Sequence, residues 1–174
     1  ASVSSGDILV FPKAGCFFKP GYFQALKMAA ASHPAGVFCT FHDLVALADV
    51  RKVGMPGLST IRVATMLEDH TTTFFDEMIS CPAVAIRRVD FDHIGGFRDY
   101  LKMPGADREL LAQAVTKGVE VVTLPEALVW FVSDYPENSR VNKKALRYRS
   151  ILPYLEASPR GLMQILMTAR GFAA

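Results

Sequence analysis

An ordered run of strand, turn and helix signals between residues 83 and 128 constrains the fold more than any other feature of the chain. An apolar segment at 82–87 is typical of a buried strand, and a helical turn is predicted directly after it at 89–94. The glycine pair Gly95-Gly96 then predicts a tight turn with positive φ. Strand and helix signals that alternate in this order favour an α/β fold.

The second half of this run predicts the clearest helix of the chain, at 107–117. Its apolar residues fall on one face, and Gly118 is a typical left-handed stop. Asp107 opens the helix, and further strands are predicted at 119–124 and 127–132.

The N-terminal part of the chain continues the same alternation. We expect strands at 7–11 and 37–41 and a helix at 21–32, which Pro20 precedes. A helix is a weaker expectation at 44–48, and 59–80 reads as an irregular connection that faces substrate. Two C-terminal helices are predicted at 137–157 and 160–170. The whole pattern predicts a mixed, mainly parallel sheet flanked by helices.

Composition limits the classes of protein that fit. The chain has 174 residues, of which 51% are hydrophobic, and its mean hydropathy is +0.22. It contains no apolar run of the roughly 20 residues that a membrane-spanning helix needs. No signal peptide is recognised, and Ala1 in place of Met suggests a processed or excised segment. The formal net charge of +2 is too small to indicate a nucleic-acid partner.

Cysteine and histidine residues show no metal-binding spacing. The three cysteines, Cys16, Cys39 and Cys81, are odd in number and widely separated, which favours reduced, buried thiols and a cytoplasmic location. The four histidines are expected at the surface or at helix ends. The polar pair His42-Asp43 could line a pocket, although a solvated loop is the commoner outcome for such a pair.

Basic residues gather after position 140, where seven lysines and arginines face the single acid Glu156. This C-terminal segment could lie on an anionic membrane surface through residues 140–170. The alternative is that its helices pack on their own domain and that the basic residues form the solvated face.

The motifs along residues 1–135 resemble, in order, those of family 2 glycosyltransferases of the GT-A fold, the fold of nucleotide-diphospho-sugar transferases. The matching residues are Gly6 to Phe11, Phe17 to Tyr22, Arg87, Arg88, Gly95, Gly96, Phe97, Asp107, Leu110, Gly118, Pro125 and Glu126. The resemblance implies a GT-A-like catalytic, acceptor-side half at 1–135 and a C-terminal helical extension at 136–174. It also implies that the nucleotide-binding half belongs to preceding sequence of a longer chain.

The resemblance implies an enzyme of the hexosyltransferase type, which moves a sugar from a nucleotide sugar to a hydroxyl of a sugar or protein acceptor. Asp107 takes the position of the general base that receives the acceptor proton. An ordinary helix N-cap is the competing interpretation of the same residue. If the resemblance holds, the carboxylate of Asp107 should face the tip of the first strand.

The tip of the first strand departs from the family. Where the family has an Asp-x-Asp that holds a divalent cation, this chain has Lys13-Ala14-Gly15, which cannot bind that ion. A cation such as Mg²⁺ or Mn²⁺ would need ligands from outside this segment. Either Lys13 replaces the metal beside the diphosphate, or it is a solvated residue of a degenerate copy. The second case would make the chain an inactive GT-A-like module that binds carbohydrate or protein.

The remaining substrate-binding candidates are implied by their places in the same pattern. Lys13 and Gly15 stand at the metal motif, and Gly96 and Phe97 border the acceptor pocket of the family. Trp130 could stack on a sugar face, although a core or interface tryptophan is commoner. An exposed sheet edge would also favour pairing of two copies of the chain.

Overall fold

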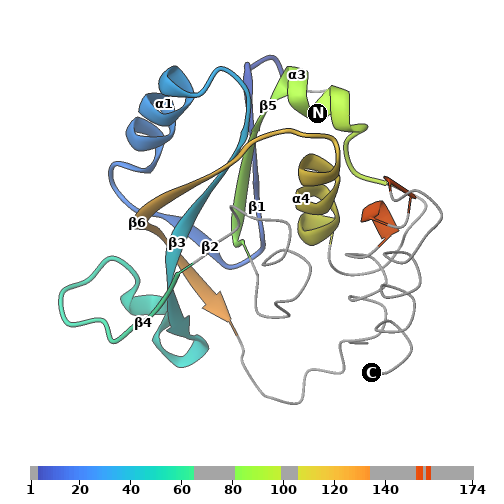
Figure 1. Ribbon diagram of the computed structural model, residues 1–174. Helices are drawn as coiled ribbons and strands as arrows, with labels where there is room; N and C mark the ends of the chain where they lie inside the picture. The colour runs from blue at the N-terminus through green and yellow to red at the C-terminus, as the bar shows by residue number, and fades with distance from the viewer. Residues whose placement is uncertain (1–3, 65–80, 99–105, 134–151, 155, 158–174) are drawn as a thin grey trace.

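The computed structural model describes residues 4–64, 81–98, 106–133, 152–154 and 156–157 (Figure 1). Its helices and strands follow one another as β1 (Ile8–Pro12), β2 (Cys16–Phe18), α1 (Tyr22–Ser32), β3 (Val37–Ala46), the 3₁₀ helix η1 (Leu47–Lys52), β4 (Ile61–Val63), β5 (Ala83–Arg87), α3 (Arg88–Ile94), α4 (Ala106–Thr116) and β6 (Val121–Ser133). The predicted helices at 21–32, 89–94 and 107–117 are confirmed, as is the mixture of strands and helices. The predicted positive φ of Gly95, Gly96 and Gly118 is also confirmed.

The strands form one mixed sheet with the order β1-β5-β3-β6-β2, and β4 pairs with β3 beside this path. Among the described pairs, β3 with β6 is parallel, whereas the other four are antiparallel. The expectation of a mainly parallel sheet is therefore wrong. An apolar run shows that a strand is buried but carries no information on its direction, and β5 lies antiparallel between β1 and β3.

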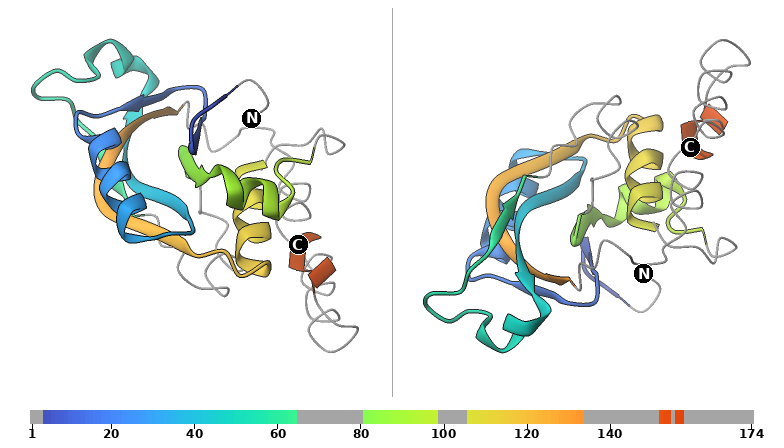
Figure 2. Two further views of the ribbon diagram at one scale, coloured as in Figure 1. Left: turned by 90° about the horizontal axis from the view of Figure 1, so that it is seen from above. Right: turned by 90° about the horizontal axis from the view of Figure 1, so that it is seen from below.

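The sheet is curved because a three-residue turn joins strands from its two ends. Five strands about 4.8 Å apart would span about 19 Å in a flat sheet, whereas the four Cα steps from Pro12 to Cys16 reach about 15 Å at most. The turn is held on both sides: the Lys13 N–H donates to the Pro82 carbonyl (2.7 Å), and the Val132 N–H donates to the Gly15 carbonyl (2.8 Å). Figure 2 shows the resulting curvature, with β3 and β6 bending together.

The predicted strands at 119–124 and 127–132 are one long strand, β6, which continues through Pro125. Its pairing with β3 shifts there, because Thr40 lies opposite Leu124 but Phe41 lies opposite Ala127. A bulge of this kind accommodates a proline, which cannot donate a hydrogen bond to the neighbouring strand.

Strand β3 is also longer than expected. It runs to Ala46, so the predicted helix at 44–48 is wrong, and the helical turn is the later η1. Residues 42–44 of β3 lie between β6 and the short β4, which the sequence did not predict. Backbone pairing on both sides holds this segment in a strand against its local helical pattern.

Helices cover the sheet in two groups, with α1 apart from α3 and α4 (Figure 1). The core is divided accordingly: Val37 and Cys39 of β3 pack in the cluster that includes α3 and α4 residues, whereas Phe38 packs with α1 residues. This alternation follows from the two-residue period of a strand.

The described part of the chain contains no helix long and apolar enough to cross a membrane. The predicted C-terminal helices lie largely outside the described residues. Within the segment, 152–154 and 156–157 are helical, and the Arg98 guanidinium donates to Glu156 Oε1 at 2.8 Å. The predicted domain boundary and the proposed membrane contact through residues 140–170 stay predictions.

Candidate functional site

The structure brings Lys13 and Asp107 into contact. The ammonium nitrogen of Lys13, in the turn after β1, lies 2.7 Å from Oδ2 of Asp107 on α4. The side chains retain 33% and 16% of their exposure, although the contacting Oδ2 of Asp107 is itself buried. The expected proximity of the Asp107 carboxylate to the tip of the first strand is therefore confirmed.

Packing and backbone bonds fix the positions of both residues. Leu110, Leu111 and Ala114 of α4 are fully buried against the sheet, which anchors the helix that carries Asp107. Asp107 is the second described residue of α4 and lies in the first turn of the helix. A carboxylate in the first turn is favoured by the positive end of the helix dipole.

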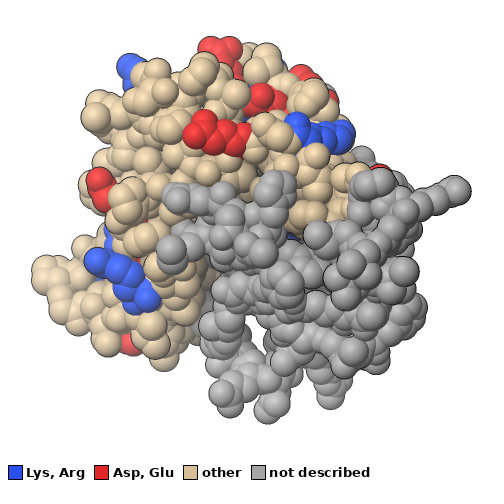
Figure 3. All heavy atoms as spheres, in the orientation of Figure 1, with Lys and Arg blue, Asp and Glu red and all other residues tan. Residues whose placement is uncertain are grey.

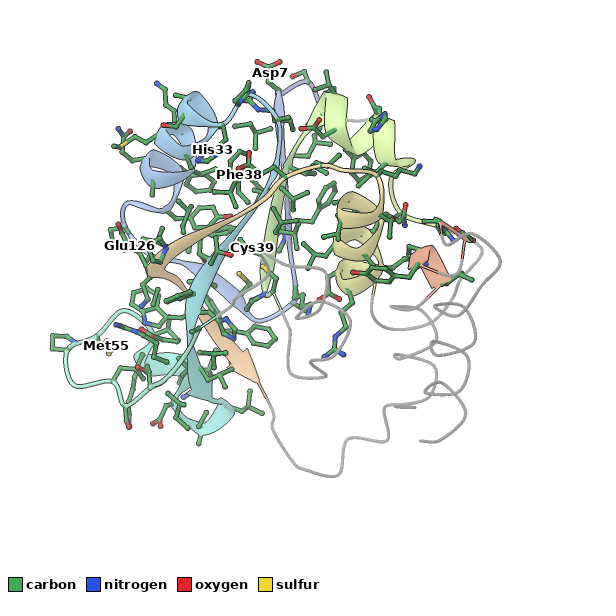
Figure 4. All side chains as sticks on the ribbon, in the orientation of Figure 1. Asp7, His33, Phe38, Cys39, Met55 and Glu126 are labelled. Carbon is green, nitrogen blue, oxygen red and sulfur yellow. The ribbon has the colours of Figure 1, made fainter. Side chains whose placement is uncertain are left out.

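A buried thiol, Cys39, lies near the Asp107 carboxylate. Cys39 and Cys81 are free and fully buried, as predicted, and Cys16 is a free, half-buried thiol. The pKa of the Cys39 thiol is well above its ordinary value because it hydrogen-bonds to Cys81, because it is buried, and because Asp107 is nearby. Figure 4 shows Cys39 in the interior of the molecule. The Cys39 thiol is therefore protonated and unreactive beside Asp107.

His42 is a buried neighbour of Lys13, and its expected position at the surface is wrong. It is 2% exposed, and its ring meets Phe131 edge to face with centroids 6.2 Å apart. Burial and the positive charge of Lys13 lower the pKa of His42 to about 4, against a smaller opposite effect of Asp43. The ring is therefore neutral at pH 7, and its Nδ1 has no hydrogen-bond partner among the described residues.

These residues do not fit a divalent cation. No three His, Cys, Asp or Glu side chains among the described residues are grouped as metal ligands would be. The strand tip instead carries the Lys13 ammonium, which repels a cation and already holds the nearest carboxylate.

Trp130 belongs to a second polar cluster, around Asp43. The Lys19 ammonium lies 5.1 Å from the centre of the Trp130 ring and also binds Asp43, and Arg62 Nε donates to Asp43 at 3.1 Å. Burial raises the pKa of Asp43, but the bonds from Lys19 and Arg62 outweigh this effect and hold the pKa below its usual range. The polar pair His42-Asp43 inside an otherwise apolar run was the sequence signal for two groups of residues. Asp43 is the centre of this cluster, and His42 lies beside Lys13.

The other candidate residues lie in tightly packed surroundings. Gly15 has φ +83°, and a Cβ there would lie 2.6 Å from the Val132 carbonyl oxygen. Gly96 lies against the Phe91 ring. Phe97 meets Phe11 edge to face, with centroids 4.8 Å apart. A role for these residues in substrate binding stays a prediction.

Charges on the described surface are mixed. Figure 3 shows basic and acidic side chains spread over one face, and the described residues on that face form no large patch of a single sign.

No protein-family model matches the chain, and no curated protein sequence does. Comparison with solved structures supports a glycosyltransferase-like fold. One similar structure is that of S. aureus TarS 1–349, which aligns with a TM-score of 0.52 at 11% sequence identity. The alignment covers 98% of this chain and 55% of the TarS chain, so this chain spans about half the length of that structure. At this identity the similarity shows the fold alone.

Proposed function

We propose that the chain is part of a family 2-like glycosyltransferase that transfers a sugar from a nucleotide sugar to an acceptor hydroxyl. The observation that carries the proposal is the contact between Lys13 and Asp107 at 2.7 Å within a glycosyltransferase-like fold. It joins the two positions at which the proposed reaction needs charge: a carboxylate for the acceptor and a cationic group for the departing diphosphate.

In the proposed reaction the acceptor hydroxyl oxygen attacks the anomeric carbon of the sugar, and Asp107 receives the hydroxyl proton. The bond from that carbon to the diphosphate oxygen breaks, and its electron pair leaves with the nucleoside diphosphate. Asp107 suits the role of base because it is anchored on a packed helix and keeps 16% of its side chain exposed, outside the buried Oδ2. The substrates are a nucleotide sugar and a sugar or protein acceptor.

The remaining candidates have proposed roles beside this centre. Gly15 allows the turn that presents Lys13 to form against β6. Gly96 and Phe97 shape the acceptor side, and Trp130 offers an aromatic face for a sugar ring.

The test is turnover of nucleotide sugars by the full-length protein, with release of the nucleoside diphosphate as the readout. Asp107→Asn should lower turnover about 10²–10⁴-fold because the acceptor proton loses its base. Asp92→Asn is the matched control, since Asp92 is an exposed acid of α3. Equal turnover by wild type and Asp107→Asn would remove Asp107 as the base.

A second candidate function is a non-catalytic scaffold that binds carbohydrate or protein. The same ion pair favours it, because an ammonium beside the carboxylate competes with an acceptor hydroxyl. Screening for glycan binding distinguishes the two functions: a scaffold binds glycans with unchanged affinity in Asp107→Asn and turns over no donor.

A further inference from the structure

The backbones of Lys13 and Asp107 are both held in place, and the Lys13 ammonium stands at the end of a flexible stem. The Lys13 backbone is held by the bond from its N–H to the Pro82 carbonyl, and its carbonyl accepts from the Cys16 N–H at 3.1 Å. Asp107 is held by α4. The four-carbon lysine stem can therefore redirect the ammonium while the rest of the site stays in place.

The surroundings of this ammonium make it responsive to an anion. His42, a titratable side chain near Lys13, is neutral at pH 7 and adds no second positive charge there. Asp107 is an acid in direct contact with Lys13, and ion pairs that keep part of their exposure are weak and exchange readily. An anion that reaches the 33% exposed Lys13 side chain competes directly with Asp107.

The competing group follows from the proposed function, on which this inference rests. A nucleotide sugar carries a diphosphate, and lysine is a usual point-charge partner of phosphate. We propose that Lys13 exchanges partners: it holds Asp107 in the free protein and moves to the diphosphate when the donor binds. The exchange releases the Asp107 carboxylate to act as base after the donor is in place, and it replaces the divalent cation that the site does not fit.

The experiment measures binding of uridine diphosphate, guanosine diphosphate and inorganic pyrophosphate to the full-length protein in the presence of EDTA. At least one probe should bind without metal. Lys13→Met, which keeps the apolar stem, should weaken that binding about tenfold, as expected for loss of one charged contact. Lys13→Arg should retain it within about threefold. Lys27→Ala, at an exposed lysine of α1, is the control and should change nothing.

The decisive variant is Asp107→Asn, alone and combined with Lys13→Met. Without its competitor, Lys13 should bind the probe about threefold to tenfold more tightly in Asp107→Asn. A simple loss of negative charge would tighten binding in either background. Exchange through Lys13 instead predicts that the gain disappears in the double variant, a non-additivity that a double-mutant cycle measures.

Several results would overturn the exchange: binding that requires Mg²⁺ or Mn²⁺, binding unaffected by Lys13→Met in a variant with wild-type thermal stability, no gain in Asp107→Asn, or binding of none of the probes. If Lys13→Met fails to fold, loss of metal-free binding in a folded Lys13→Arg would contradict the exchange as well.

The proposed function and the exchange can fail separately. Turnover that depends on Asp107 but needs metal would support the function and contradict the exchange. Metal-free binding with the expected non-additivity in the double-mutant cycle, but no turnover of any donor, would support the exchange and contradict the proposed function.

Discussion

Burial changes the chemistry of two adjacent residues of β3 in different ways. His42 has lost its solvent and lies near the Lys13 ammonium, so its neutral form is favoured. Asp43 is also buried, yet it stays ionised because Lys19 and Arg62 bind it directly. A buried charge persists where partners replace its solvation, and a buried group without them loses its charge.

The lowered pKa of His42 predicts a loss of stability in mild acid. The folded pKa is about 4, below the roughly 6.5 of an unfolded histidine. Between these values the unfolded chain binds more protons, so the free energy of unfolding falls as pH decreases from 6.5 towards 4. Denaturant titrations at pH 7 and pH 4.5 should show a loss about 2 kcal/mol greater for wild type than for His42→Gln. Equal losses would mean that His42 is protonated in the fold.

At the scale of elements, the two arginines where β5 ends and α3 begins bind other segments of the chain. Arg87 donates to the carbonyl oxygens of Ala30 and His33, at the C-terminal end of α1, with Nη2 2.9 Å from the His33 oxygen. Arg88 Nη2 donates to the carbonyl oxygen of Ser4 at 2.7 Å. Carbonyls at a helix end lack helical partners, so Arg87 supplies bonds that α1 cannot make itself.

Arg87→Lys should therefore destabilise the protein by about 1–2 kcal/mol, because an ammonium cannot reproduce the planar fork on two carbonyls. Arg88→Lys is the control with the same chemical change, and its cost should be less than about 0.5 kcal/mol because the bonds it loses, to Ser4 and Gly6, are exposed to solvent. Thermal melts of both variants measure the difference. Similar melting temperatures would show that the bonds to α1 contribute little.

At the scale of the whole molecule, closure of the curved sheet depends on how closely the turn at Lys13 approaches β6. Gly15 makes this approach possible, since it has positive φ and lies against the Val132 carbonyl. The same turn carries Lys13 to Asp107, so the overall curvature of the sheet positions the candidate site.

Gly15→Ala should cost about 3 kcal/mol or more, because it combines a positive φ with a clash against backbone. Gly57→Ala is matched in φ, at +79° against +83°, but has no atom within 4 Å of the added Cβ. It should cost about 1 kcal/mol, the price of the backbone conformation alone. Chemical denaturation of the two variants checks this order, and equal costs would contradict the close approach of the turn to β6.

The sequence by itself determined the local features: α1, α3 and α4, the apolar strand β5, and the positive φ of Gly95, Gly96 and Gly118. Helical periodicity, stop glycines and apolar runs act over a few residues, so they can be recognised without the fold. The resemblance in motif order also predicted that Asp107 would lie near the first strand.

The tertiary structure alone decided the direction of the strands, the passage of β6 through Pro125, the burial of His42 and the partner of Lys13. Each of these depends on segments far apart in the chain. The direction of a strand and the charge of a polar side chain both depend on neighbouring residues. Only the folded sheet brings these neighbours close.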